Sequence, residues 1–230
     1  MFDYVGPPRE IPELESRTMP HGRFYKLGAS WVPSVTTVIG HQSKQGILEW
    51  QKRVGYTEAE KIRTASSWRG TKFHNLVEAY LRNEYTEMYK KAKKSEEGQG
   101  LTNYLFRAAR KDLDRIDNIH CIEAPLYSND LCLAGRVDCI AEFDGELAII
   151  DFKTTGTLKQ EAWLEKYFVQ EAAYSYMYWE RTGCEVKKLV TLSIAEDGQT
   201  QVVQKYDKIP YIDTLCEWIK EFRYFLGSKV

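Results

Sequence analysis

Two aspartates and a lysine lie in one short stretch of the chain, at a spacing that could build a metal-dependent hydrolytic site. Residues 135–155 read GRVDCIAEFDGELAIIDFKTT, and Asp144-Gly145 separates two strand-like runs. Asp-Gly is typical of a two-residue hairpin, because a type I′ turn needs positive φ at both central positions. With these residues as the loop, Asp138 faces Asp151 across the hairpin, and Lys153 shares their face of the sheet.

Two opposed carboxylates repel each other unless a cation lies between them. A divalent ion such as Mg²⁺ or Mn²⁺ removes the repulsion, because hard cations take carboxylate and water oxygens as ligands. A neighbouring lysine can orient or help deprotonate the attacking water, or stabilise charge on a phosphate. The alternative is a solvated surface hairpin with an Asp–Lys pair, but the apolar run LAIID that ends at Asp151 favours a buried strand. The opposite face is then expected in the core, with Val137, Cys139, Ala141, Phe143, Ala148, Ile150 and Phe152.

Helices are expected before this hairpin, and a mixture of helices and strands after it. Helical patterns cover residues 46–81 with breaks near Gly55 and Gly70, then 101–116, 161–182 and 209–226. Strand patterns cover residues 21–31, 119–126, 131–143, 146–152, 185–195 and 201–206. This order predicts an α/β fold in which a small mixed central β-sheet is flanked by helices, with an N-terminal helical elaboration. We expect a single domain, made of a loose N-terminal arm (1–20), the helical elaboration (44–116), the catalytic core (117–206) and a C-terminal helix (207–230). The polar stretch 90–100 is expected to be a mobile connection.

Composition excludes several classes of protein. The five cysteines include no CxxC pair, which argues against a disulfide framework or a zinc or iron–sulfur site. No apolar run approaches the roughly 20 residues that span a bilayer, and the first residues lack the pattern of a signal peptide, so a cytoplasmic protein is expected. The GxxxxGK[ST] motif is absent, which argues against ATP binding. A net charge of -1 does not indicate nucleic-acid binding, but carboxylates at a site can cancel basic residues along a groove.

The residues of the hairpin resemble a known family. Gly135 to Asp138, followed by Asp151 to Thr154, is similar to the core of the PD-(D/E)XK nucleases, in the branch that contains the RecB nuclease domain. The order of the matching segments also resembles mitochondrial genome maintenance and phage exonucleases. The other matching segments are Pro33-Ser34-Val35-Thr36, Gly70-Thr71-x-x-His74-x-x-x-Glu78, Glu123-x-Pro125-Leu126 and Gln170-x-x-x-Tyr174.

The resemblance implies a role for each matched residue. Asp138, Asp151, His74 and the Phe152 carbonyl would bind one or two Mg²⁺ or Mn²⁺ ions. Lys153 would position the attacking water. Glu78, Gln170 and Tyr174 would support the catalytic site, although ordinary packing or solvated positions are the alternative for these three residues and for His74. Contacts with DNA are implied for Ser34, Thr36, Arg69, Arg136, Lys153, Thr154 and Tyr174.

The implied function is a metal-dependent DNA exonuclease acting on single-stranded DNA or DNA ends, without ATP and without a membrane. Basic and aromatic residues alternate in 46–69, which suits a channel for one strand, although a solvated helical pair is the alternative. Two other functions compete: a structure-selective endonuclease, and a non-catalytic DNA-end-binding recombination accessory protein. The intact Asp138, Asp151 and Lys153 argue against the accessory protein. The phage-like resemblance suggests a role in DNA replication or recombination. We expect Asp151→Ala or Lys153→Ala to abolish cleavage with little loss of stability.

Overall fold

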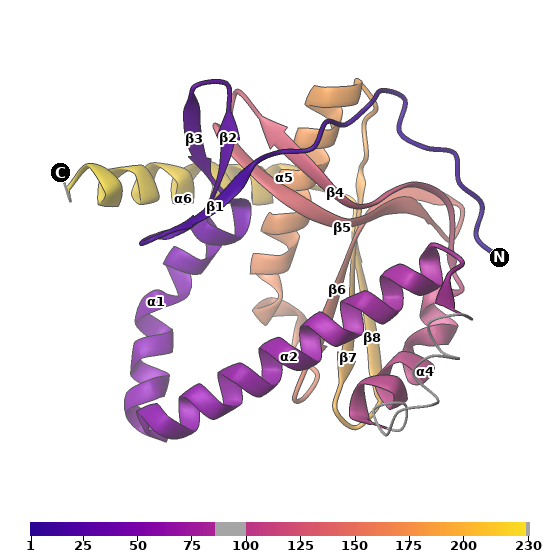
Figure 1. Ribbon diagram of the computed structural model, residues 1–230, viewed down its shortest axis with the longest axis horizontal. Helices are drawn as coiled ribbons and strands as arrows, with labels where there is room; N and C mark the ends of the chain where they lie inside the picture. The colour runs from indigo at the N-terminus through magenta and orange to yellow at the C-terminus, as the bar shows by residue number, and fades with distance from the viewer. Residues whose placement is uncertain (86–99, 229–230) are drawn as a thin grey trace.

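A five-stranded sheet forms the centre of the protein in a computed structural model, which describes residues 1–85 and 100–228 (Figure 1). The β6–β7 pair is parallel and the other neighbouring strands are antiparallel, so the sheet is mixed, as the sequence predicts. The first three strands of the chain form a second, three-stranded sheet. The central strands, in spatial order, are β4 (Ile116–Ser128), β5 (Leu133–Phe143), β6 (Glu146–Thr155), β7 (Lys188–Ala195) and β8 (Thr200–Lys205).

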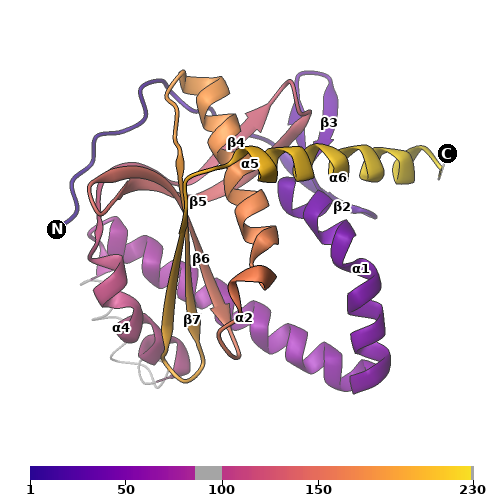
Figure 2. The ribbon, with the colours of Figure 1, turned by 180° about the vertical axis from the view of Figure 1, so that it is seen from behind.

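Helices cover both faces of the central sheet (Figures 1 and 2). One apolar cluster joins the sheet to α5 (Glu165–Thr182), which follows the short 3-10 turn Glu161–Trp163, and to α6 (Ile209–Gly227). The other cluster joins it to α2 (Tyr56–Leu81) and α4 (Leu101–Leu113). Burial on both faces explains why the central strands are apolar along most of their length. The predicted α/β class and the mixed sheet between helices are therefore confirmed.

The β5–β6 hairpin has the predicted register. Phe143 pairs with Glu146 and Cys139 with Ile150, and the turn residues have φ values of 55° and 76°. The ladder ends at that second pair, one step before Asp138 and Asp151. The Asp138 carboxylate instead accepts a hydrogen bond from the Phe152 N–H at 3.0 Å. The two strands thus separate where the predicted site begins, because a side chain takes the place of a backbone acceptor.

One residue of the expected core face lies on the other side of the sheet. Val137 joins the cluster that contains Ile140 and Ile149, whereas Cys139 joins the cluster under α2. The register between β4 and β5 places this part of β5 opposite Glu123, whose φ is 50°. The irregular backbone at Glu123 interrupts the alternation of faces, which a period of two cannot predict.

Two long helices precede the central sheet. Ser34 caps α1 (Val35–Val54) by accepting a hydrogen bond from the Thr37 N–H, and the helix ends at Gly55, whose φ is 93°. The predicted break at Gly55 is confirmed, but the predicted break at Gly70 is wrong, because α2 continues to Leu81. A Cβ at Gly70 would lie 3.8 Å from the Thr154 hydroxyl. Packing of α2 on the sheet therefore outweighs the weak helix propensity of this glycine.

The N-terminal segment is more firmly held than the expected loose arm. Ser16–Met19 form β1, which pairs with β2 (Gly22–Leu27), and β2 pairs in turn with β3 (Ser30–Pro33). Near the start of the chain, the Asp3 carbonyl accepts from the Ile119 N–H at 2.8 Å, and the Val5 N–H donates to the Ile119 carbonyl at 3.0 Å. These are backbone contacts, which side-chain patterns do not reveal.

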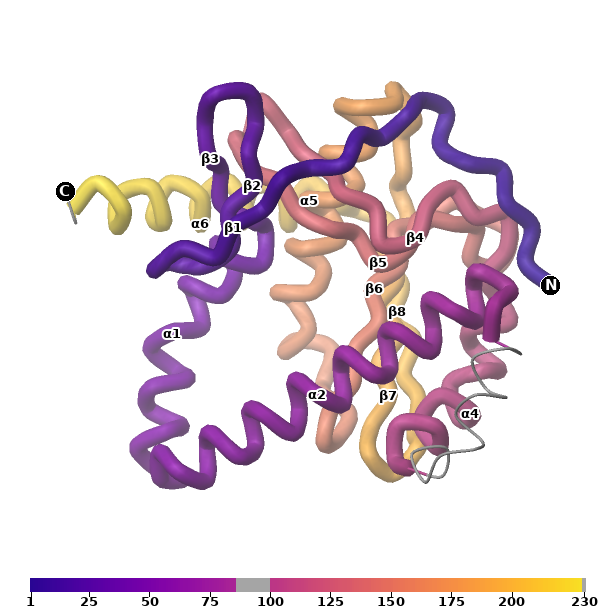
Figure 3. Tube along the Cα trace, in the orientation of Figure 1, coloured from indigo at the N-terminus to yellow at the C-terminus, as the bar shows by residue number. Residues whose placement is uncertain are grey.

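Between these anchors, residues 7–14 run along the central sheet, and we call them the N-terminal strap (Figure 3). Residues 90–99 of the predicted mobile connection lie outside the described residues. Within the described ranges, no helix is long and apolar enough to cross a membrane.

Candidate metal and catalytic site

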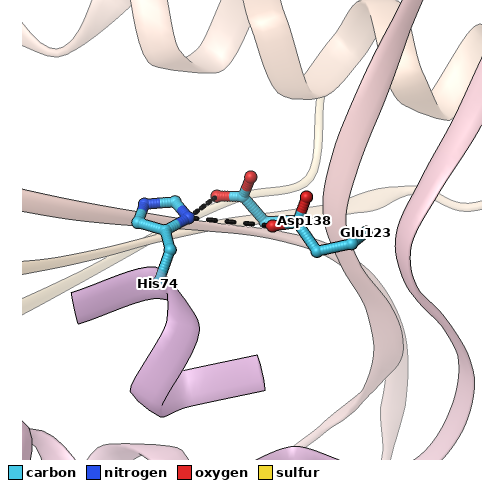
Figure 4. Close-up of side chains that lie close together, drawn as sticks. All are labelled: His74, Glu123 and Asp138. Atoms are coloured by element: carbon cyan, nitrogen blue, oxygen red, sulfur yellow. Dashed lines mark ion pairs between the residues drawn. The ribbon is translucent and has the colours of Figure 1, made fainter. Parts of the chain in front are cut away.

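Three side chains from three different elements form a candidate metal site. His74 comes from α2, Glu123 from β4 and Asp138 from β5, and their potential ligand atoms all lie within 4.8 Å of one another (Figure 4). His74 Nδ1 is 3.7 Å from Asp138 Oδ2 and 3.9 Å from Glu123 Oε1. We call these three residues the metal triad. Two carboxylates and an imidazole form a donor set that fits a divalent cation.

The imidazole of His74 is oriented by the backbone of β6. His74 Nε2 lies 2.8 Å from the Phe152 carbonyl oxygen, so the ring N–H at this nitrogen donates to the carbonyl. The other nitrogen, Nδ1, is left facing the two carboxylates. Metal-binding histidines commonly donate their second N–H in this way, which fixes the tautomer. The Phe152 carbonyl, expected as a metal ligand, therefore contacts His74 in this structure.

The negative charge of the metal triad is partly compensated within the site. Burial lowers the pKa of His74, but the neighbouring Asp138 and Glu123 carboxylates raise it by more, to about 9. At neutral pH the imidazolium is thus a counter-ion for the two carboxylates in the metal-free protein. A divalent ion would replace that positive charge and release a proton from the ring.

Asp151 and Lys153 form a second group beside the metal triad. Asp151 is 2% exposed, and its Oδ1 accepts a hydrogen bond from Gln170 Nε2 at 2.9 Å, while its Oδ2 is paired with Lys153. Burial raises the pKa of Asp151 to about 6 despite the opposing effect of Lys153. Burial lowers the pKa of Lys153, but Asp151 and Asp138 raise it by more, so the net shift is upward. Lys153 is therefore a charged ammonium group held at the site by a buried carboxylate.

A cavity of about 490 Å³ opens at the metal triad and collects residues that are distant in sequence. Its wall includes the buried Tyr174, which lies against Gly135. Glu78 also lines it, and its Oε1 accepts a hydrogen bond from Arg82 Nε at 3.0 Å. The predicted site residues that line this cavity are Ser34, Thr36, His74, Glu78, Arg136, Asp138 and Tyr174.

Other predicted residues do not line this cavity. Arg69 is buried and ion-paired with Glu196, beyond the end of β7, and it lines a different cavity. Thr154 lies next to Gly70 of α2. Lys153 and Gln170 are brought to the site through Asp151, as described above. Most of the predicted site residues thus lie in or beside this cavity, but Arg69 is ion-paired at a different place in the fold.

Sequence reasoning missed two acidic residues. Glu123 belongs to a segment that matches the family pattern, but no role was inferred for it, because its approach to His74 depends on the positive φ that interrupts β4. Glu171 is completely buried on α5 and accepts a hydrogen bond from the Thr191 hydroxyl. Burial, together with the nearby Asp151, holds the pKa of Glu171 well above its usual value. A carboxylate between apolar residues of a predicted helix was the available signal.

We expect Gly135→Ala to destabilise the protein by about 1–3 kcal/mol, the usual cost of overpacking. A Cβ at this position would lie 2.7 Å from the ring of Tyr174, so the ring or the strand must move. Urea denaturation measures the effect. Gly46→Ala, in α1, is the matched control, because its Cβ would meet no atom within 4 Å and alanine favours a helix by up to about 1 kcal/mol. Equal stability of Gly135→Ala and wild type would contradict this packing of Tyr174.

Known proteins resemble this chain in sequence and in fold. The family model of the PD-(D/E)XK nuclease superfamily matches residues 48–224. Mitochondrial genome maintenance exonuclease 1 of Homo sapiens is 25% identical over 132 residues, which cover 54% of this chain and 37% of that protein. The match therefore spans little more than a third of the relative's length. A crystal structure of a candidate exonuclease from Eubacterium rectale aligns with a TM-score of 0.45 and 11% identity, over 66% of this chain and 64% of that chain.

Proposed function

The chain belongs to the PD-(D/E)XK nuclease superfamily, and from that premise we propose that it is a metal-dependent DNA exonuclease. It would hydrolyse phosphodiester bonds in single-stranded DNA or at DNA ends. One observation carries the proposal: the metal triad lies beside the buried Asp151–Lys153 pair, at the point where β5 and β6 separate. The name of the similar human protein supports exonuclease action.

The metal triad and Asp151 would hold the divalent ion. PD-(D/E)XK nucleases generally use divalent metal ions, and we propose Mg²⁺ or Mn²⁺, as one or two ions. When bound, such an ion supplies Lewis-acid activation of water and neutralises negative charge on the phosphate. Asp138 accepts a hydrogen bond from the Phe152 N–H, and Asp151 accepts one from the Gln170 side chain, so both carboxylates are held in place before an ion binds.

Lys153 would act as a cation and hydrogen-bond donor in the reaction. Its raised pKa keeps the ammonium group protonated, so it suits orienting the attacking water or stabilising charge on the phosphate better than removing a proton. Gln170 would serve as a positioning residue, because it acts on the reaction through Asp151. The cavity residues Arg136, Ser34 and Thr36 would contact the DNA backbone.

Exposed aromatic and basic groups on α2 favour a single strand as the substrate. Trp68 is 59% exposed, and the ammonium group of Lys72 lies 3.8 Å from the centre of its ring. Tyr56, beside Gly55 at the start of α2, is also exposed. Aromatic rings that stack on bases, next to cations that contact phosphates, are the usual means of binding single strands without sequence preference. We further propose that the activity serves DNA replication or recombination in the cytoplasm, a hypothesis that rests on the resemblance of the sequence to phage exonucleases.

We expect the protein to degrade linear single-stranded DNA and to leave a circular single strand intact. End-labelled strands are incubated with Mg²⁺, Mn²⁺ or EDTA, and products are separated by gel electrophoresis. EDTA should stop the reaction, because the metal triad then lacks its ion. Cutting of the circle would instead support the endonuclease, and metal-dependent binding without cleavage would support the accessory protein.

A further inference from the structure

A lysine and a tyrosine lie next to Lys153, on the side of the sheet where β6 leads into α5. Lys159, in the connection between these two elements, donates a hydrogen bond from its Nζ to the Tyr167 hydroxyl at 3.1 Å. Tyr167 belongs to the first turn of α5. The centre of its ring is 5.1 Å from the ammonium group of Lys153 and 5.3 Å from that of Lys159. One tyrosine side chain therefore neighbours both the proposed catalytic lysine and a second lysine.

The positions of Lys159 and Tyr167 are fixed by packing and by a backbone contact. The Tyr167 ring packs against an apolar cluster that includes Phe168 and Val203. The Lys159 carbonyl accepts a hydrogen bond from Gln201 Nε2 at 3.1 Å. Both residues are partly exposed, so a ligand can reach them. Groups that are held in place before a ligand arrives lose less conformational entropy when it binds.

This lysine–tyrosine pair has hydrogen-bond donors to spare. The Tyr167 hydroxyl accepts from Lys159, so its own hydrogen remains available, and no acceptor for it lies among residues 1–85 and 100–228. An ammonium group has three N–H donors, and the Tyr167 hydroxyl takes only one of those of Lys159. Spare donors on a positively charged group suit an anion, because charge-assisted hydrogen bonds are the stronger ones.

Nearby carboxylates do not neutralise Lys159. Glu161 is ion-paired with Lys205. Asp151 is paired with Lys153. Glu165 precedes Tyr167 by two residues on α5, and residues two apart on a helix do not face each other. Within the described parts of the chain, Lys159 therefore keeps a positive charge that no direct ion pair compensates.

The pair lies where the phosphate next to the cleaved one would pass. In the proposed function, Lys153 orients the attacking water or stabilises charge on the cleaved phosphate. Successive phosphates of a strand are separated by one sugar, a span similar to the length of a tyrosine side chain. A strand whose cleaved phosphate lies at Lys153 therefore brings its next phosphate within reach of the Tyr167 hydroxyl and of Lys159, since the tyrosine ring neighbours both ammonium groups.

We propose that Lys159 and Tyr167 form a phosphate subsite, which binds the backbone phosphate next to the one that is cleaved. The Lys159 ammonium group supplies positive charge, and the Tyr167 hydroxyl donates its free hydrogen to a phosphate oxygen. Phosphate contacts fix the register of a strand on a protein. This inference rests on the proposed function and adds to it two residues that place the cleaved bond at Lys153 and the metal triad.

The salt dependence of binding tests the subsite. Fluorescent linear single-stranded DNA is titrated with Asp138→Asn in EDTA, which should leave the strand intact because the metal triad lacks a carboxylate and its ion. For single strands, log affinity falls with log salt by about 0.7 per phosphate contact. Adding Lys159→Met should lower this slope by about 0.7 and weaken binding roughly tenfold at low salt. Adding Tyr167→Phe should weaken binding without changing the slope, because it removes a hydrogen bond and no charge.

Lys205→Met is the matched control in the same background. Lys205 Nζ lies 5.3 Å from the centre of the Phe168 ring, in the same region, but this lysine is already ion-paired with Glu161. It should keep the slope. The proposal is overturned if Lys159→Met keeps the slope, if Lys205→Met lowers it equally, if Tyr167→Phe binds with unchanged affinity, or if no strand is bound. Thermal melting of all variants establishes that they are folded.

A neutral linkage locates the subsite along the strand. Linear strands carry one methylphosphonate linkage, placed one position to either side of the first bond that wild type cleaves with Mg²⁺. At one of these positions the neutral linkage should slow wild type roughly tenfold and should not slow Lys159→Met further, because the contact is already absent. Equal slowing of both proteins at both positions would overturn the assignment. If wild type fails to cleave DNA with metal, the proposed function fails, whereas the salt slopes still decide whether Lys159 binds a phosphate.

Discussion

Lys153→Met should lower the rate of metal-dependent DNA cleavage by a factor on the order of 10²–10⁴, the usual contribution of a positioned group that transfers or stabilises a proton or charge. The ammonium group lies at the site because Asp151, 2% exposed, holds it there. Methionine keeps much of the volume and removes the charge. The rate is measured with labelled linear single-stranded DNA at saturating Mg²⁺, so that weaker binding of metal does not enter the comparison.

The same substitution should also cost stability, whereas the sequence alone predicts little loss for Lys153→Ala. Breaking a buried ion pair leaves an unpaired charge and typically costs about 3–5 kcal/mol. Asp151 can reduce this cost by taking up a proton, since burial already raises its pKa to about 6. Urea denaturation of Lys153→Met and of Lys153→Met/Asp151→Asn separates the two effects, because the second variant has no buried charge left unpaired.

Lys188→Met is the control for loss of a buried lysine. Lys188 is 3% exposed, donates to the Phe143 carbonyl at 2.7 Å and is 3.7 Å from Glu146, at the hairpin end of the sheet. We expect it to lose stability and to keep its rate of cleavage at temperatures where it is folded. Equal loss of activity in the two variants would show that Lys153 acts through stability alone.

Glu123→Gln and Asp138→Asn should each weaken Mn²⁺ binding on the order of 100-fold or more, since loss of a supporting group alone costs 10–100-fold. Each substitution removes one carboxylate from a metal triad whose ligand atoms lie within 4.8 Å of one another. Electron paramagnetic resonance of free Mn²⁺ during a titration measures the affinity directly. At low metal concentration, the rate of DNA cleavage by each variant should fall in parallel with its Mn²⁺ affinity.

Glu142→Gln is the matched control for these two variants. Glu142 lies on β5 with Asp138, and it accepts a hydrogen bond from the side-chain amide of Asn118 at 2.9 Å, away from the metal triad. It should bind Mn²⁺ as wild type does. Normal affinity in Glu123→Gln would remove this residue from the site, and an equal loss in all three variants would indicate a general effect of acidic charge.

The sequence alone determined the parts of the site that depend on local geometry. Asp144-Gly145 specifies the hairpin turn, and the turn specifies the register that places Asp138, Asp151 and Lys153 where the pairing of β5 with β6 ends. Helical spacing likewise places His74 and Glu78 on one face of α2. These features follow from turn chemistry and from the periods of strands and helices, which involve residues close together in the chain.

Tertiary structure alone decided which of these groups meet. Glu123 reaches His74 only because its backbone has a positive φ, and Arg69 is committed to Glu196, 127 residues away. The strap runs along the central sheet because backbone groups near Asp3 pair with Ile119. Such contacts join residues that are distant in sequence, through backbone hydrogen bonds and ion pairs that no side-chain pattern records. Their geometry is set by how α2, β4 and the strap pack around the sheet.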